Sequence, residues 1–310
     1  MKEFSVNQKL MGTAFTLGLL AEKETQANQW LEMGVNEIKR IENLLSEFMP
    51  SSETTNINRH ASLKPVKTDP ECFELIKRCC HISELTKGDF DITVSPLKGL
   101  YQFKNAQFEM PEKEVINKVL QSVGFKNIAL DSNETSVRFR HPQTKISFAA
   151  IGKGYASDQV KQLWLVNGVK SGYINASGDL NAFGYKADGK AWKIGIANPD
   201  DKNKMLLFVP LPNSSVATSG DYEQYFIFKN RRYSHNLNPH NGMPLSGIKS
   251  VTVFSPAAEL SDALATAIYV KGVVRGIAFT NQLPQTHCII IDDKNKIFFS
   301  DRLNYETVSN

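Results

Sequence analysis

The sequence predicts a single compact α+β domain over residues 1–310, with mixed and antiparallel sheets and flanking helices. Strand-like segments occur both as adjacent pairs joined by short turns and singly between helices, which argues against a doubly wound parallel sheet. No stretch rich in proline, glycine and serine separates two independent units. A repeat of roughly 20 to 50 residues, the mark of a solenoid or propeller, is also absent from the sequence.

The composition excludes several classes of protein. Hydrophobic residues make up 41% of the chain, enough to bury a substantial core, so disorder is not its main state. Thirty-six Lys and Arg against 32 Asp and Glu leave a net charge of +4, without a basic arm. We therefore expect no nucleic-acid partner. No apolar run reaches about 18 residues, so no membrane-spanning helix is expected.

Helices are predicted from apolar residues that recur every three or four positions. The N-terminal apolar stretch Ala14–Ala21 comes first and is expected to be a buried strand rather than a secretory signal. Apolar periodicity then predicts a helix over Thr25–Phe48, ended by Pro50, and the polar stretch Ser51–Arg59 is expected to be a loop. The next predicted helices are Pro70–Thr86, Glu112–Val123 and Lys153–Val166.

The second half of the chain is predicted to be richer in strands. The expected strands are Lys170–Ile174, Trp192–Ala197, Leu206–Leu211 and the hairpin of Tyr222–Phe228 with Arg231–Leu237. Towards the C-terminus we expect a strand at Lys249–Phe254, helices at Glu259–Val270 and Val273–Thr280, and a hairpin over His287–Ser300. Cys72, Cys79, Cys80 and Cys288 show no CxxC spacing and are interpreted as core thiols rather than as a disulfide framework or a metal site.

The segment Ala149–Tyr155 combines glycine with a lysine where a strand gives way to a helix. Free backbone N–H groups, the helix dipole and Lys153 all favour an anion such as phosphate. The glycine spacing of a Walker A loop is missing, as is the Ser or Thr after the lysine. An ordinary turn between a strand and a helix is the alternative interpretation.

A second polar segment, Ala217–Tyr222, leads into the predicted hairpin and then to His235. Small hydroxyl residues beside glycine let a ligand approach the backbone, and a histidine can transfer a proton near neutral pH. The alternative is turn chemistry, because the Asn-Pro and Asn-Gly pairs that follow His235 are common turn formers.

Asp262 and Thr266 form the third candidate, on the helix predicted near the C-terminus. Residues four apart on a helix lie on one face, about one turn from each other, so one hard cation can reach both oxygens. Mg²⁺ would need its other ligands from carbonyls, water or ligand phosphates. The alternative for Asp262 is a helix cap or a solvent-facing carboxylate.

A series of ordered blocks, rather than any one of them, identifies a family. They are Met11–Thr13, Leu45–Phe48 with Asn56–Asn58, Gly88–Leu97, Ile151–Asp158, Asn175–Asp179, Ala217–Tyr222, Ser250–Val253 and Asp262–Ala267. In these blocks, which span most of the chain, the sequence resembles the FAD:protein FMN transferases, also called the thiamine-biosynthesis lipoprotein ApbE family.

The resemblance implies an ApbE-like fold, related to the T-fold, and a Mg²⁺-dependent reaction. Members of the family split the pyrophosphate of FAD, transfer FMN to a Thr or Ser hydroxyl of an acceptor protein as a phosphoester, and release AMP. By motif position, the side chains of Asp262 and Thr266 and the backbone carbonyl of Ala150 would bind the metal. Asp221 and His235 are the candidates for handling the proton of the acceptor hydroxyl. The residues that would line the FAD pocket are Met11, Phe48, Gly88, Asp89, Phe90, Ser147, Lys153 and Leu237.

The chain departs from the family pattern at a few positions. Asn238 stands where an acidic residue is usual, Asn241 where Thr is usual, Ser177 where Gly is usual, and Ser147 where Asp is common. Two alternatives to the transferase stay open. One is a Mg²⁺-dependent FAD pyrophosphatase that releases FMN and AMP, and the other is a non-catalytic FAD-binding protein.

The resemblance also implies the kind of partner. Its acceptors would be membrane-bound electron-transfer subunits or soluble reductases that carry a short Thr-containing flavinylation motif. The chain as given has no lipidation signal or cysteine near its start. A cytoplasmic form and an exported, membrane-anchored form that has lost its leader are both compatible with this sequence.

Overall fold

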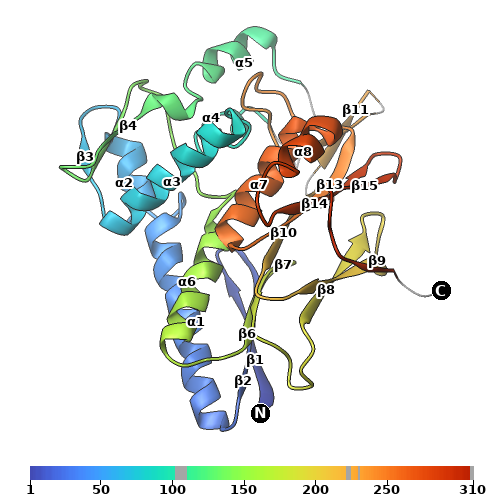
Figure 1. The fold of residues 1–310 in the computed structure, drawn as a ribbon. Helices are drawn as coiled ribbons and strands as arrows, with labels where there is room; N and C mark the ends of the chain where they lie inside the picture. The colour runs from blue at the N-terminus through green and yellow to red at the C-terminus, as the bar shows by residue number, and fades with distance from the viewer. Residues whose placement is uncertain (102–109, 221–224, 230, 308–310) are drawn as a thin grey trace.

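An eight-stranded antiparallel sheet runs through the protein in the order β1-β2-β6-β7-β10-β13-β14-β15 (Figure 1). The computed structural model describes residues 1–101, 110–220, 225–229 and 231–307. Helices and antiparallel sheets together confirm the predicted α+β class. The sheet strands are β1 Lys2–Leu10, β2 Thr13–Ala21, β6 Gly172–Ala176, β7 Asp179–Phe183, β10 Ser215–Gly220, β13 Ile248–Ser255, β14 His287–Asp292 and β15 Ile297–Phe299.

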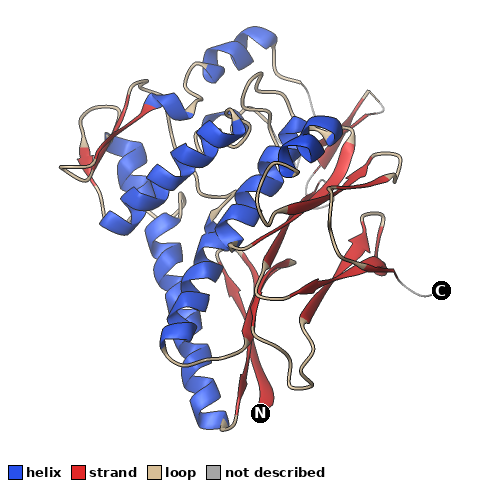
Figure 2. Cartoon of the chain, in the orientation of Figure 1, coloured by secondary structure: helices blue, strands red, loops and turns tan. Residues whose placement is uncertain are grey.

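Three long helices cover one face of this sheet: α1 (Glu24–Leu45), α6 (Gly152–Val166) and α7 (Ala258–Lys271) (Figure 2). The predicted apolar stripe of α1 is confirmed, because its members face the core. They are Leu31, Val35, Ile38, Ile41 and Leu45. The helix ends three residues earlier than expected, since Ser46 adopts an extended backbone, and Phe48 therefore lies beyond it.

A smaller three-stranded sheet, in the order β16-β9-β8, packs on the other face. Its strands are β8 Trp192–Asn198, β9 Asp201–Leu211 and β16 Glu306–Thr307. Leu180, Val216 and Phe254 of the main sheet form one apolar cluster with Trp192 and Val209 of the smaller sheet. The central strands are thus buried on both faces, and the end of one of them, β10, lines the pocket described below.

The prediction of a loop over Ser51–Arg59 was wrong, because α2 spans Glu53–His60. The Ser52 hydroxyl accepts a hydrogen bond from the backbone N–H of Thr55, and Ile57 is fully buried. A helix with so few apolar residues has little periodicity, and its cap and its packing against the rest of the protein stabilise it. Strand β1 was missed for a similar reason: most of its side chains are exposed, and it is defined by its pairing with β2.

The other predicted helices and strands are present, with shifts at some ends. Helix α3 spans Pro70–Thr86, as predicted, with the Asp69 carboxylate accepting from two N–H groups of its first turn. The second strand of the predicted hairpin ends at Ser234 instead of Leu237, and residues 222–224 and 230 of this hairpin lie outside the described residues. Of the other predicted elements, α5 spans Lys113–Leu120, α8 spans Val273–Thr280, and the described hairpin strands are β11 Tyr225–Phe228 and β12 Arg231–Ser234. The sheet strands β7 and β10 were not predicted from the sequence, nor were the elements β3 Val66–Lys67, α4 Ser95–Lys98, β4 Ile128–Asp131 and β5 Ser136–Phe139.

All four cysteines are free thiols, and Cys72, Cys79 and Cys288 are buried, in agreement with their interpretation as core residues. Burial raises the pKa of each of these three thiols, so they stay protonated at neutral pH. None of the helices in the described part of the chain combines the length and the apolar character that crossing a membrane requires.

Candidate active site

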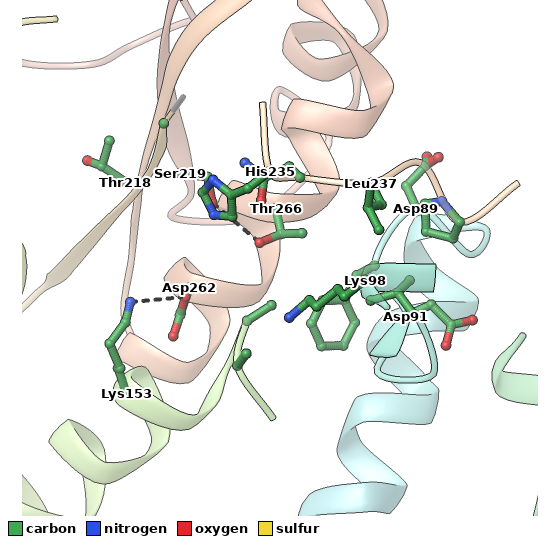
Figure 3. A pocket seen from close by; sticks show the side chains of 17 residues that line it. Asp89, Asp91, Lys98, Lys153, Thr218, Ser219, His235, Leu237, Asp262 and Thr266 are labelled. Carbon is green, nitrogen blue, oxygen red and sulfur yellow. Dashed lines mark hydrogen bonds and ion pairs between the residues drawn. The ribbon is translucent and has the colours of Figure 1, made fainter. Parts of the chain in front are cut away.

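One pocket collects most of the residues selected from the sequence (Figure 3). Its walls come from the start of α6, the end of β10, the middle of α7 and the segments around residues 89–98 and 235–239. The predicted site residues that line it are Asp89, Phe90, Ala150, Lys153, His235, Leu237, Asp262 and Thr266. The fold thus brings together segments that are far apart in the sequence.

Four of the described predicted site residues, Met11, Phe48, Gly88 and Ser147, are not part of this lining. Phe48 is 87% exposed, and Asp221 lies outside the described residues. Met11, in the turn between β1 and β2, lies beside Gly152 at the start of α6. Gly88 has a φ of 84° and lies beside the ring of His240. Ser147 is buried and donates a hydrogen bond to the carboxylate of Glu47 over 2.7 Å.

Lys153 shares its charge with two carboxylates. Its Nζ lies 2.5 Å from Oδ2 of Asp179 and 3.9 Å from Oδ1 of Asp262. The other oxygen of Asp179 accepts from the backbone N–H of Thr218, so this carboxylate joins α6 to strand β10. Asp179 belongs to one of the blocks that mark the family, yet the sequence predicts no role for it. Its pairing with Lys153 is a tertiary contact that no spacing in the chain could reveal.

Asp262 is a buried carboxylate with weak partners. It is 5% exposed, and besides Lys153 it meets the backbone N–H of Gly154, which lies 3.3 Å from Oδ2. Burial raises the pKa of Asp262 above its usual value, and nearby Asp179 raises it further, while Lys153 and the Gly154 N–H lower it. The positive groups around Asp262 thus do not fully offset the cost of burying its charged carboxylate, and an additional cation fits here.

The oxygen atoms around Asp262 suit a hard cation. Thr266 follows one turn later on α7, with its hydroxyl 3.3 Å from that of Ser219, and Ala150 lines the same pocket. A carboxylate, a hydroxyl and a backbone carbonyl are ligands that Mg²⁺ accepts. No cluster of three His, Cys, Asp or Glu side chains that could hold a metal occurs among the described residues, so a site built from side chains alone is not indicated there. The residues present fit a Mg²⁺ ion that takes its remaining ligands from a bound phosphate.

The opposite wall is held by a different set of charges. Oδ1 of Asp89 lies 2.9 Å from Nε2 of His240, and Oδ2 lies 2.5 Å from Nζ of Lys271 on α7. Asp89 therefore ties the segment after α3 both to α7 and to the loop that follows His235. Phe90 next to it is almost completely buried.

The loop after His235 is built by its asparagines. Oδ1 of Asn238 accepts from the backbone N–H of His240, and Oδ1 of Asn241 accepts from the N–H of Met243. Aspartate makes the same local hydrogen bond, so asparagine at position 238 preserves the turn while removing a charge. At the loop's base, Leu237 pairs with Pro244 through an isolated β-bridge, which places Leu237 in the pocket wall.

Lys98, at the end of α4, is a pocket residue that sequence reasoning missed. Its ammonium points towards the middle of the pocket in Figure 3. Within the described part of the chain it has no ion pair or hydrogen bond, in contrast to Lys153. No motif or periodicity marks this lysine in the sequence, because its position depends on how α4 packs against the rest of the pocket.

The chain is similar to known proteins along most of its length. The family model described as the ApbE family matches residues 11–290. The FAD:protein FMN transferase of Vibrio cholerae is 27% identical over 297 residues, covering 94% of this chain and 88% of that protein. The crystal structure of the ApbE protein of Thermotoga maritima superposes with a TM-score of 0.89 at 30% identity, covering 97% of both chains. The flavinyl transferase ApbE of Pseudomonas stutzeri, in its apo form, gives 0.83 at 25% identity, covering 96% and 94%.

Proposed function

The chain belongs to the ApbE family, and from this premise we infer that the pocket is the active site of a flavin transferase. The protein is an enzyme that uses FAD and transfers its flavin part to a protein, as the names of its relatives state for them. The observation that carries this function is that α6 and α7 bring Lys153, Asp262 and Thr266 to one pocket. We further propose that residues 1–310 work as one domain, since the pocket is lined from residue 89 to residue 266.

The reaction proposed for this pocket is a phosphoryl transfer. An acceptor Thr or Ser oxygen forms a bond to the FMN-side phosphorus of FAD, the bond from that phosphorus to the AMP oxygen breaks, and the hydroxyl proton is lost. Asp262, Thr266 and the carbonyl of Ala150 would hold Mg²⁺, which offsets phosphate charge when bound. Lys153 donates a hydrogen bond to Asp179, and it is positioned to orient a phosphate oxygen or a flavin oxygen as well.

We propose that His235 and Asp221 take up the proton of the hydroxyl group on the acceptor protein. His235 lines the pocket, within reach of a group bound beside Thr266. For FAD itself we propose Asp89, Phe90 and Leu237 as pocket contacts. The supporting contacts outside the lining would come from Met11, Gly88, Ser147 and Phe48.

The proposed acceptors are electron-transfer subunits or reductases that carry a flavinylation motif. The first experiment is intact mass spectrometry of a Thr-bearing flavinylation domain, incubated with the protein, FAD and Mg²⁺. We expect a gain of one FMN and an equal amount of AMP, both lost when the metal is chelated. Free FMN and AMP with an unmodified acceptor would instead identify a pyrophosphatase, and intact bound FAD would identify a binding protein.

Replacing Lys98 with methionine is expected to weaken FAD binding about 10-fold, because one charge-assisted contact to a phosphate is worth about 1.4 kcal/mol. Riboflavin has no phosphate, so its affinity should not change. Flavin fluorescence titrations without acceptor measure both. Lys39, which is exposed on α1 away from the pocket, provides the matched control as Lys39→Met. Equal loss of FAD and riboflavin affinity would contradict a phosphate contact.

A further inference from the structure

Helices α6 and α7 touch at their first turns without side chains between them. A Cβ atom built on Gly154 would lie 2.2 Å from the carbonyl oxygen of Ala258 and 2.8 Å from Cα of Glu259. At such distances, a side chain at position 154 would force the backbone of α7 to move. The backbone of α6 therefore supports the first turn of α7 directly, one turn before Asp262.

Asp158, one turn further along α6, caps α7 from outside. Its Oδ1 accepts from the N–H of Ala258 over 3.0 Å, and its Oδ2 accepts from the N–H of Glu259 over 2.8 Å. The amide of Asn181 on β7 donates to Oδ1 over 2.8 Å and holds the carboxylate in place. Burial raises the pKa of Asp158, while the two N–H groups of α7 lower it. Lys161 also faces Asp158 and lowers its pKa, whereas nearby Glu259 raises it.

Helix α7 has no cap of its own. Its N-cap residue is Ala257, with φ −124° and ψ 136°, a backbone conformation suited to a capping side chain, yet alanine supplies no acceptor. The first free N–H groups of α7 are thus satisfied by a residue about 100 positions earlier in the chain. A local serine or aspartate would satisfy such groups equally well if helix stability were the only requirement.

We propose that Asp158 is a positioning residue for the proposed metal pair, Asp262 and Thr266. By fixing the start of α7 to α6, it sets where Asp262 lies relative to Lys153 and the N–H of Gly154. This inference rests on the proposed metal binding, but not on the transfer reaction. A displacement of α7 along α6 would leave the pair on the same helix face while moving it away from Ala150 and Lys153.

Two variants separate positioning from simple helix stabilisation. Asp158→Ala removes the cap from α6, and Asp158→Ala combined with Ala257→Ser gives α7 a local cap instead. We expect the single variant to melt at a lower temperature and to bind Mg²⁺ at least about 10-fold more weakly, measured by calorimetry without FAD or acceptor. The double variant should recover most of the melting temperature but not the Mg²⁺ affinity. Recovery of both would overturn the proposal, as would an unchanged affinity in the single variant.

Further measurements cover the effect of charge and the case of poor folding. Asp158→Asn removes the charge but keeps one acceptor, so its Mg²⁺ affinity should lie between those of the wild type and Asp158→Ala; equal loss in both would assign the effect to charge and count against positioning. Should Asp158→Ala not fold, the comparison runs with Asp158→Asn, alone and with Ala257→Ser.

In activity assays of the Asp158 variants, the half-saturating Mg²⁺ concentration should rise, while kcat at saturating Mg²⁺ falls less. If a variant that lacks the Asp262 carboxylate binds Mg²⁺ as tightly as the wild type, this proposal is overturned. If the wild type binds Mg²⁺ through Asp262 but transfers no FMN, only the proposed function is contradicted.

Discussion

Replacing Asp262 with asparagine is expected to reduce FMN transfer about 1,000-fold, corresponding to a loss of roughly 4 kcal/mol of transition-state stabilisation. The amide has nearly the same shape as the carboxylate but lacks the negative charge that a hard cation requires. Transfer would be measured by the mass gain of the acceptor domain over time, at several Mg²⁺ concentrations. Raising the Mg²⁺ concentration should not restore the wild-type rate, because the variant lacks the charged ligand itself and additional metal in solution does not replace it.

The same variant is expected to fold at least as stably as the wild type without metal. Burial raises the pKa of Asp262, which means that keeping the carboxylate ionised in the folded protein costs free energy at neutral pH. Removing that charge relieves the cost, and Lys153 keeps its ion pair with Asp179. Asp188→Asn, on an exposed turn, is the matched control and should leave both rate and stability unchanged. Full activity of Asp262→Asn would exclude this pair as the metal site.

Replacing Gly154 with alanine should have the largest effect on the fold around the site. Alanine raises helix propensity by about 1 kcal/mol over glycine. However, its Cβ would lie 2.2 Å from a backbone oxygen of α7, which can move only with the whole first turn of that helix. We expect a net loss of about 1–3 kcal/mol in the free energy of unfolding, as for other overpacked sites. Weaker Mg²⁺ binding should accompany this loss.

Gly152, two residues earlier in the same turn, is the matched control. A Cβ there would meet Met11 and Phe148 at 3.5 and 3.6 Å, which is ordinary van der Waals contact. Gly152→Ala should therefore be tolerated or slightly stabilising, because only the gain in helix propensity remains. Denaturant unfolding followed by circular dichroism measures both variants. Similar stabilities for the two would show that α6 and α7 do not require the close approach at Gly154.

Local patterns were sufficient for the long elements. Helix α1 follows from its apolar stripe, and α3 begins at Pro70, as expected from the sequence. The four-residue spacing of Asp262 and Thr266 predicts that both lie on one helix face, and α7 carries them one turn apart. These features depend on residues that are close in the chain, so their spacing is visible in the sequence.

Other features were invisible to such patterns. Helix α2 has little apolar periodicity, and edge strand β1 shows no clear alternation of burial, so each depends on its partners elsewhere in the fold. Phe48, expected to extend the stripe of α1, lies past the end of the helix with its ring exposed. Propensity and patterning compete with tertiary packing, and at these positions packing decided the outcome.

The sequence by itself determined the family, the α+β class and the chemical types of the candidate site residues. The tertiary structure alone decided which charges meet: Lys153 with Asp179, Asp89 with His240 and Lys271, and the Asp158 carboxylate with the start of α7. It also placed Lys98 in the pocket without a partner among the described residues. The physical reason is that hydrophobic periodicity is set by neighbours along the chain, whereas an ion pair or a cap between helices depends on distances across the fold, which spacing does not encode.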